Sequence, residues 1–201
     1  MIMNFTEKTA DNFFKLRYLD NYMSGHKGFI AGGVFKNIFE NKPFKDIDIF
    51  FENEKDYKEA FDKFSKDKDY SKLYENKSAS CFQKNNSKIK VDLVKSTYGS
   101  HNEIISKFDF TITKFSYFKK ENEEGGLNYM CSFHNDFFEH LSCKKLVIDD
   151  KVPFPIGTFE RSYRYKSYGY GLCRESKSKL IQALQGAKTE NLSKDLYFGW
   201  D

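Results

Sequence analysis

One stretch of the sequence decides the fold: Phe29-Ile-Ala-Gly-Gly-Val-Phe-Lys-Asn-Ile-Phe-Glu-Asn-Lys-Pro-Phe-Lys-Asp-Ile-Asp-Ile-Phe-Phe51. It begins with a short apolar run that is typical of a buried strand and passes through two glycines into a helical pattern over residues 34 to 39. After a turn, a second strand is expected over residues 46 to 51. Because side chains i and i+2 of a strand share a face, Asp46 and Asp48 should point the same way.

Two neighbouring carboxylates repel each other and are tolerated mainly where a cation lies between them. Their hard oxygen atoms suit Mg²⁺ that is bound together with substrate phosphates. Gly32 and Gly33 allow a close approach of the backbone, and the helix that begins after them offers N–H groups to an anion. The stretch therefore predicts phosphoryl or nucleotidyl transfer. The alternative is a hairpin or strand–helix unit with two surface aspartates.

The Gly-Gly turn, the spacer over residues 34 to 45 and Asp-x-Asp resemble the signature of the polymerase β-type nucleotidyltransferases. The resemblance is closest to the head of the poly(A) polymerase and CCA-adding tRNA nucleotidyltransferase branch, whose pattern is Gly-Gly-x-Val-Arg-Asp, a short helix and Asp-x-Asp. Lys36 and Asn37 stand where that branch has Arg and Asp. The resemblance implies an α+β fold, with a mixed, mostly antiparallel sheet of about five strands flanked by helices.

A third carboxylate is expected on a neighbouring strand. Residues 88 to 94 alternate, with Ile89, Val91 and Leu93 on one face and Asp92 on the other. Enzymes of this superfamily often carry a third acid there, and Asp92 resembles this acid, which acts as the base that activates an attacking hydroxyl. Asp92 would therefore complete the metal site or activate the acceptor. The alternative is an exposed aspartate on a polar strand face.

Two later segments resemble the CCA-adding branch. Asp109-Phe-Thr-Ile112 is similar to a segment that lines the nucleotide pocket there, although Asp109 could instead cap a helix over residues 110 to 118. Arg161 and Arg164 lie one helical turn apart and so share a face. They resemble the neck helix that closes the nucleotide pocket. The alternative is a basic amphipathic helix that forms salt bridges with the head.

The remaining pattern predicts two parts, a catalytic head over residues 1–120 and a helical, neck-like region over residues 121–201. Further helices are expected over residues 6–23, 54–67 (capped by Asn53), 101–107, 136–143 and 175–187, and strands over residues 70–74, 79–83 and 128–133. The aromatic tail, residues 196–200, should fold back on the core or contact a partner. Few residues follow the resemblance, which covers about residues 25 to 172, so we do not expect a stand-alone CCA-adding enzyme.

Composition narrows the class of protein. The net charge of +4 is compatible with a polyanionic partner. The sequence shows neither an apolar run that could span a membrane nor a signal peptide. The four cysteines form no Cys-x-x-Cys pair, which argues against zinc and favours a reduced, cytoplasmic protein.

These observations predict a nucleotidyltransferase that uses Mg²⁺, with Mn²⁺ as a substitute, and transfers a nucleoside monophosphate from ATP or another NTP to a hydroxyl. The leading acceptor is an RNA 3′ end, and a protein or small-molecule hydroxyl is the alternative. The predicted metal ligands and catalytic residues are Asp46, Asp48 and Asp92, and the predicted nucleotide-binding residues are Gly32, Gly33, Lys36, Asp109, Arg161 and Arg164. Two other hypotheses stay open, a nucleotide- or RNA-binding module that has lost catalysis and a structural protein. The oligomeric state is not predicted.

Overall fold

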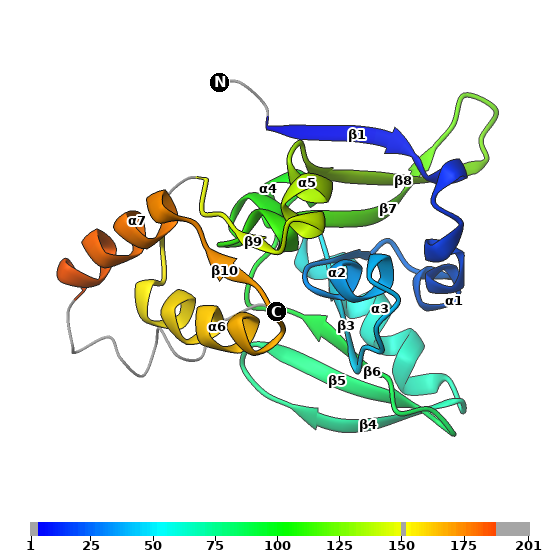
Figure 1. The fold of residues 1–201 in the computed structure, drawn as a ribbon. Coiled ribbons are helices and arrows are strands. Elements are labelled where there is room, and N and C mark those ends of the chain that lie inside the picture. The colour runs from blue at the N-terminus through cyan, green and yellow to red at the C-terminus, as the bar shows by residue number, and fades with distance from the viewer. Residues whose placement is uncertain (1–3, 150–151, 188–201) are drawn as a thin grey trace.

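A computed structural model describes residues 4–149 and 152–187, and its centre is an eight-stranded sheet (Figure 1). The strand order is β1-β8-β7-β2-β3-β6-β5-β4. The β3–β6 pair is parallel and every other pair in this sheet is antiparallel. The strands are β1 (Phe5–Thr9), β2 (Phe29–Ala31), β3 (Asp46–Phe50), β4 (Tyr70–Glu75), β5 (Ala79–Lys84), β6 (Lys90–Val94), β7 (Phe115–Glu121) and β8 (Leu127–His134).

The sheet confirms the predicted fold class, a mixed and mostly antiparallel sheet flanked by helices, but it has eight strands instead of about five. It extends through β8, and the proposed division at residue 120 stays a prediction. A separate parallel pair joins β9 (Lys145–Leu146) to β10 (Gly171–Leu172). The predicted aromatic tail lies outside the described residues.

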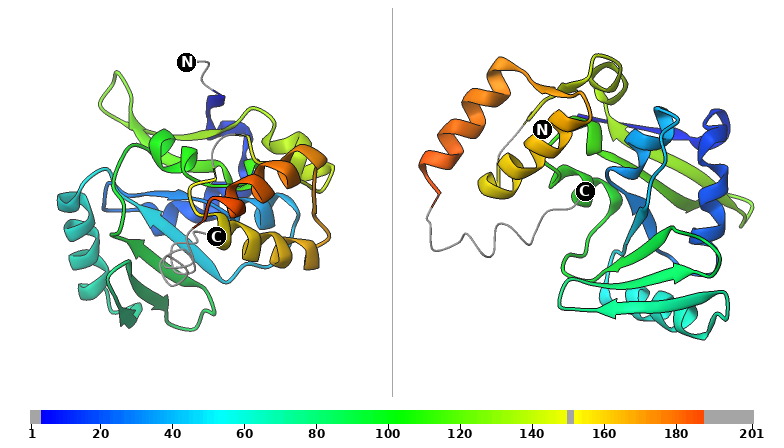
Figure 2. Two further views of the ribbon diagram at one scale, coloured as in Figure 1. Left: turned by 90° about the vertical axis from the view of Figure 1, so that its left-hand side faces the viewer. Right: turned by 60° about the horizontal axis from the view of Figure 1, so that its bottom comes forward.

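Helices cover both faces of the sheet. The α-helices are α1 (Asp20–Met23), α2 (Val34–Phe39), α3 (Glu54–Lys66), α4 (His101–Ser106), α5 (Phe137–Ser142), α6 (Pro155–Ser167) and α7 (Arg174–Gln185), and three 3₁₀ turns are η1 (Ala10–Asn12), η2 (Phe14–Leu19) and η3 (Thr111–Thr113). Among the described residues, none of the helices has the length and apolar character that crossing a membrane requires. Helices α6 and α7 lie side by side at one end of the sheet (Figure 2).

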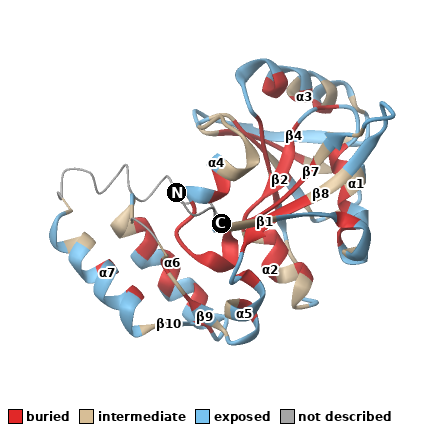
Figure 3. Ribbon diagram, turned by 90° about the horizontal axis from the view of Figure 1, so that it is seen from above, coloured by how far each residue is buried: buried red, intermediate tan, exposed pale blue. Residues whose placement is uncertain are grey.

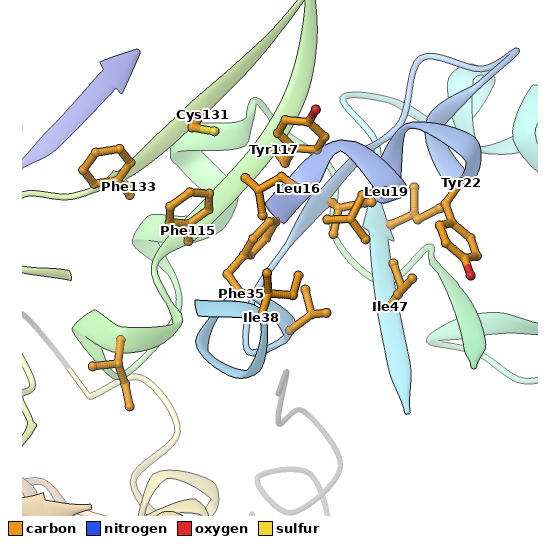
Figure 4. Close-up of a cluster of buried hydrophobic side chains, with 14 of the residues drawn as sticks. Leu16, Leu19, Tyr22, Phe35, Ile38, Ile47, Phe115, Tyr117, Cys131 and Phe133 are labelled. Atoms are coloured by element: carbon orange, nitrogen blue, oxygen red, sulfur yellow. The ribbon is translucent and has the colours of Figure 1, made fainter. Parts of the chain in front are cut away.

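The core is built largely from aromatic rings. On one face, α2 and α3 pack against Ile47 and Ile49 of β3, and the rings of Phe35 and Phe115 lie 4.4 Å apart between their centroids (Figure 4). On the other face, Ile104 and Ile105 of α4 pack against a smaller cluster that includes Phe50. Buried residues concentrate in the central strands, whereas α3 and α7 expose their outer surfaces (Figure 3).

The local pattern predicts the unit around the Gly-Gly turn accurately. Helix α2 covers residues 34 to 39 as expected, and β3 begins at Asp46. Asn53 caps α3, since its side chain accepts a hydrogen bond from the Asp56 N–H at 3.0 Å. These segments confirm the prediction because helical period, cap and turn residues all agree there.

The predicted helix over residues 6 to 23 is wrong in its first part. Residues 5 to 9 form β1, which pairs along its whole length with β8. Leu16 and Leu19 are fully buried within η2, and residues three apart also share a face in a 3₁₀ helix. The three-residue spacing that suggested an α-helix therefore fits the observed turn equally well.

The predicted helix over residues 110 to 118, with Asp109 as its cap, is also wrong. Only the three residues of η3 are helical, and β7 follows from Phe115 with partners on both sides, β2 and β8. Residues 115 to 118 are all buried. A strand buried on both faces shows no alternation, so its apolar run resembles part of a buried helix.

Candidate active site

The parallel pair β3–β6 brings the predicted carboxylates together. Asp48 lies directly opposite Asp92 in the register of these two strands, and Asp46 lies opposite Lys90. Directly paired residues of neighbouring strands point to the same face of a sheet. The same face of the sheet therefore carries Asp46, Asp48 and Asp92, and α4 covers this face further along β3. Ile47 and Val91 point to the opposite face, into the main core.

Two of the three carboxylates, Asp46 and Asp92, interact electrostatically. Asp46 is exposed at the rim, yet neighbouring atoms partly desolvate its carboxyl group and raise its pKa. Lys90 and Lys45 lower this pKa, whereas the charge of Asp92 raises it further. Asp46 therefore lies close enough to Asp92 to be affected by its charge, as expected for carboxylates that converge on one site.

Asp92 has a partner that the sequence did not reveal. The Tyr74 hydroxyl donates a hydrogen bond to Asp92 Oδ1 at 3.0 Å, from two strands away. Between them lies Cys81, and burial together with Asp92 raises the pKa of its thiol to about 12. Cys81 is therefore a neutral neighbour of the carboxylate.

A pocket of about 390 Å³ opens beside Asp46. It lies between the Gly-Gly turn with α2, the turn that leads into β3, and α6. Its polar lining is mostly cationic and includes Lys36, Lys42, Lys45 and Arg164, together with Gly33, Asp46, Tyr165 and Tyr168. The structure thus brings four predicted site residues into one pocket, namely Gly33, Lys36, Asp46 and Arg164.

Lys36 is held within a group of tyrosine rings. Only 5% of the residue is exposed, and its Nζ lies 5.1 Å from the ring centroid of Tyr168, 5.5 Å from Tyr165 and 5.9 Å from Tyr170. Its ammonium group also donates a hydrogen bond to Asn37 Oδ1. Aromatic faces attract a cation, so this arrangement fixes a positive charge at the pocket wall.

Gly32 has a backbone conformation that favours glycine. Its φ of +105° is one that other residues rarely adopt, and its N–H donates to the Phe115 carbonyl oxygen at 3.1 Å. The Gly32 amide is thus used by the sheet. Gly33, at the N-cap position of α2, lies at the pocket wall.

Two predicted nucleotide-binding residues pair with each other instead of lining the pocket. Arg161 Nη2 lies 2.6 Å from Asp109 Oδ2, and Arg161 Nε donates to the same oxygen at 2.8 Å. Both residues are buried. The geometry favours the alternative of a salt bridge between this helix and the head, while a contact with nucleotide stays a prediction for both.

The carboxylates are the type of ligand that a Mg²⁺ site requires. Within residues 4–149 and 152–187, no three His, Cys, Asp or Glu side chains already converge as a metal-binding group. Mg²⁺, however, keeps several waters and binds through one or two carboxylates plus substrate phosphates. The pair of Asp48 and Asp92, with Asp46 beside it, supplies such oxygen ligands. Desolvation is the main cause that raises the Asp46 pKa, and a cation would offset the smaller contribution of the Asp92 charge.

Comparison with known proteins places the chain in a family. The model of the "Gabija anti-defense 2 family protein" group matches residues 4–144, which is most of the chain. The chain belongs to the Gabija anti-defense 2 family. A curated relative, "Gabija anti-defense 2" of Bacillus phage SPbetaL7, is 24% identical over 158 residues, which cover 78% of this chain and 37% of the relative. The chain thus spans little more than a third of that relative's length.

Solved structures show the fold of this Gabija anti-defense 2 family member. A CCA-adding enzyme in complex with CTP matches 94% of the chain and 49% of its own length, with a TM-score of 0.63 and 14% identity. A tRNA nucleotidyltransferase complexed with a primer tRNA and an incoming ATP analog matches 90% of the chain and 54% of its own length, with a TM-score of 0.57 and 18% identity. The chain therefore has the nucleotidyltransferase fold, as the resemblance implied, whereas the matching family model is that of the Gabija anti-defense 2 proteins.

Proposed function

We propose that the chain is a Mg²⁺-dependent nucleotidyltransferase that transfers a nucleoside monophosphate from an NTP to an acceptor hydroxyl. One observation carries this proposal: Asp46 belongs both to the cationic pocket and to the group of carboxylates. Asp46 lines the cationic pocket, and its carboxyl group is affected by the charge of Asp92, which lies opposite Asp48. A triphosphate in the pocket would therefore have its phosphates next to the carboxylates.

Each group then has a role in this reaction. Lys36 and Arg164, with Lys42 and Lys45 nearby, bind and orient the phosphates, and the Gly-Gly turn lets them approach the backbone. Asp46, Asp48 and Asp92 would hold Mg²⁺, which supplies charge neutralisation at the triphosphate when it is bound. Asp92 completes this set or accepts the proton of the attacking hydroxyl. The acceptor oxygen attacks the α-phosphorus, and pyrophosphate leaves.

The same proposal assigns the two parts of the chain. Residues 1–120 form the catalytic head, and residues 121–201 include α6 as a neck-like helix. Its residues Arg164 and Tyr165, together with the adjoining Tyr168, close the pocket. In this proposal the arrangement corresponds to the head and the start of the neck in the CCA-adding branch. The pocket between the Gly-Gly turn and α6 supports the assignment, since a protein with an accidental acidic pair would need no such pocket.

An RNA 3′ end is the leading acceptor. The matched tRNA nucleotidyltransferase was solved with a primer tRNA, and the chain has a net charge of +4, which favours a polyanion. A second candidate acceptor is a hydroxyl on a protein of the host defence. The family name favours it, because the relative is described as an anti-defence protein against Gabija.

The test incubates the purified protein with each of four α-³²P-labelled NTPs, with Mg²⁺ or Mn²⁺, and with total cellular RNA or a Gabija-containing lysate. The Asp46→Ala/Asp48→Ala double variant is the inactive comparison, and Asp62→Ala, on the exposed surface of α3, is the matched control. The proposal is supported if the unmodified protein and the control both label RNA or a protein band and the double variant does not. The labelled species then identifies the acceptor class. If no label transfers and triphosphate binding does not depend on Mg²⁺, the reading of a module without catalysis replaces it.

A further inference from the structure

A row of four residues crosses the sheet at the candidate site. In the strand registers, Tyr74 of β4 lies opposite Cys81 of β5, Cys81 lies opposite Asp92 of β6, and Asp92 lies opposite Asp48 of β3. Because directly paired residues share a face, all four side chains belong to the same side of the sheet. The row connects an edge strand with the central carboxylates.

Tyr74 reaches this row only because β4 contains a β-bulge. Tyr70 lies opposite Lys84 and Lys72 opposite Phe82, and the register then shifts so that Tyr74 lies opposite Cys81. Regular alternation would place Tyr74 on the same face as Tyr70 and Lys72, which contact rings of α3. The extra residue reverses this direction, and bulges next to active sites are known to redirect a side chain in this way.

The redirected tyrosine contributes little to the core. Tyr74 is 44% exposed, whereas Cys81 beneath it is fully buried. The hydroxyl donates to Asp92 Oδ1 at 3.0 Å. A carboxylate that accepts one fixed hydrogen bond is restrained in its rotation, and its remaining lone pairs stay available to other groups.

We propose that Tyr74 is a positioning residue that orients the Asp92 carboxylate toward Asp48, so that both can bind one divalent cation. This inference rests on the proposed function, because it assigns Asp92 to the metal site. Partners that orient metal ligands from outside the first coordination shell typically change metal affinity or activity about 10–100-fold when they are replaced. The same effect is expected for the loss of the Tyr74 hydroxyl.

The test measures Mn²⁺ binding to the full chain by electron paramagnetic resonance, with a non-hydrolysable ATP analogue present. Tyr74→Phe keeps the ring and removes only the hydroxyl, and it should weaken Mn²⁺ binding about tenfold or more. Tyr70→Phe removes a hydroxyl from the opposite face of the same strand and should bind Mn²⁺ as the unmodified protein does. Circular dichroism and thermal unfolding confirm that both variants fold.

The outcomes separate this inference from the proposed function. If Tyr74→Phe binds Mn²⁺ as tightly as the unmodified protein, while Asp92→Asn does not, the positioning role is wrong and the metal site stands. If the unmodified protein binds no Mn²⁺ with the analogue, both proposals are overturned. With an acceptor in hand and Mg²⁺ at a saturating concentration, Tyr74→Phe should lower kcat about tenfold and leave the KM for the NTP unchanged, since Tyr74 does not line the triphosphate pocket.

Discussion

Arg161 Nη2 lies 2.6 Å from Asp109 Oδ2, and this buried ion pair joins helix α6 to the segment that precedes η3. The two residues are 52 positions apart in the sequence. The pair therefore fixes α6, which carries Arg164 and Tyr165 of the pocket, against the segment between α4 and η3. We expect the pair to hold α6 in place at the side of the pocket.

Breaking this pair should strongly destabilise the protein. Arg161→Met leaves the Asp109 carboxylate buried and unpaired, which typically costs about 3–5 kcal/mol of unfolding free energy. Urea denaturation followed by circular dichroism measures the change. Arg174→Met, at the exposed start of α7, should stay within about 0.5 kcal/mol. An Arg161→Met variant as stable as the control would show that the pair is dispensable.

Lys36 should matter for triphosphate binding more than for folding. Lys36→Met keeps a side chain of similar length among Tyr165, Tyr168 and Tyr170 but removes the charge. Since a hydrogen bond to a charged group contributes about 1.5–3 kcal/mol, ATP affinity should fall about tenfold or more. Isothermal titration calorimetry with ATP and Mg²⁺ measures this. Lys55→Met on the exposed face of α3 serves as the control, and equal affinities in the two variants would contradict the assignment.

His26 should make the stability depend on pH. Burial lowers the pKa of His26 to about 4, the Tyr22 carbonyl partly opposes this, and the charges of Lys119 and Lys63 lower it further. Between pH 6.5 and 4 the unfolded chain binds more protons at this residue than the folded one. The contribution of the neutral His26 to the free energy of unfolding is therefore complete above pH 6.5. It is lost as the pH falls toward 4, by about 3 kcal/mol in total.

Urea denaturation at pH 7 and pH 5 measures this dependence. His26→Gln retains an acceptor for the Gly28 N–H and a donor for the Tyr22 carbonyl, which are the hydrogen-bond partners of the ring. The variant should lose stability at pH 7 but show a smaller change between the two pH values. If the stability of the variant depends on pH as strongly as that of the unmodified protein, residues other than His26 cause the pH dependence.

Gly28 should tolerate no larger residue. A Cβ atom built there would lie 2.6 Å from Ile49 Cγ2 and 2.6 Å from Phe51 Cε1, both in the core. Gly28→Ala must displace these side chains, and overpacking of this kind typically costs about 1–3 kcal/mol. Gly171→Ala is the matched control, because nothing lies within 4 Å of its Cβ position. Thermal unfolding distinguishes them, and equal melting temperatures would contradict the prediction.

The sequence predicts those parts of the site that depend on local pattern. The Gly-Gly turn, α2 and the two aspartates of β3 follow from turn residues, helical period and strand alternation. The spacing also predicts that Asp92 lies on a polar strand face. The sequence does not show how β3 and β6 align, and only the paired strands of the structure show that Asp92 lies opposite Asp48.

Long-range relationships escape such reasoning. Asp109 looked like a cap because the backbone groups near it could be satisfied locally, but its partner is Arg161 on α6. Tyr74 lies on a strand whose alternation points it to the wrong face, and the bulge that redirects it leaves no mark in the sequence. The local pattern predicts helices at β1 and at β7, because it does not contain their pairing with strands distant in the chain, β8 for β1 and β2 for β7.

The pairing of β1 with β8 has a consequence for synthesis on the ribosome. Phe5 lies opposite His134, so β1 can pair with β8, its neighbour within the described part of the sheet, only after that residue has emerged from the ribosome. Until then β1 is a free edge, and the charged Glu7 and Lys8 on it disfavour pairing with another nascent chain. A ribosome that stalls before β8 would leave both β1 and the outer side of β7 uncovered, and the nascent chain would be most prone to aggregation in that interval.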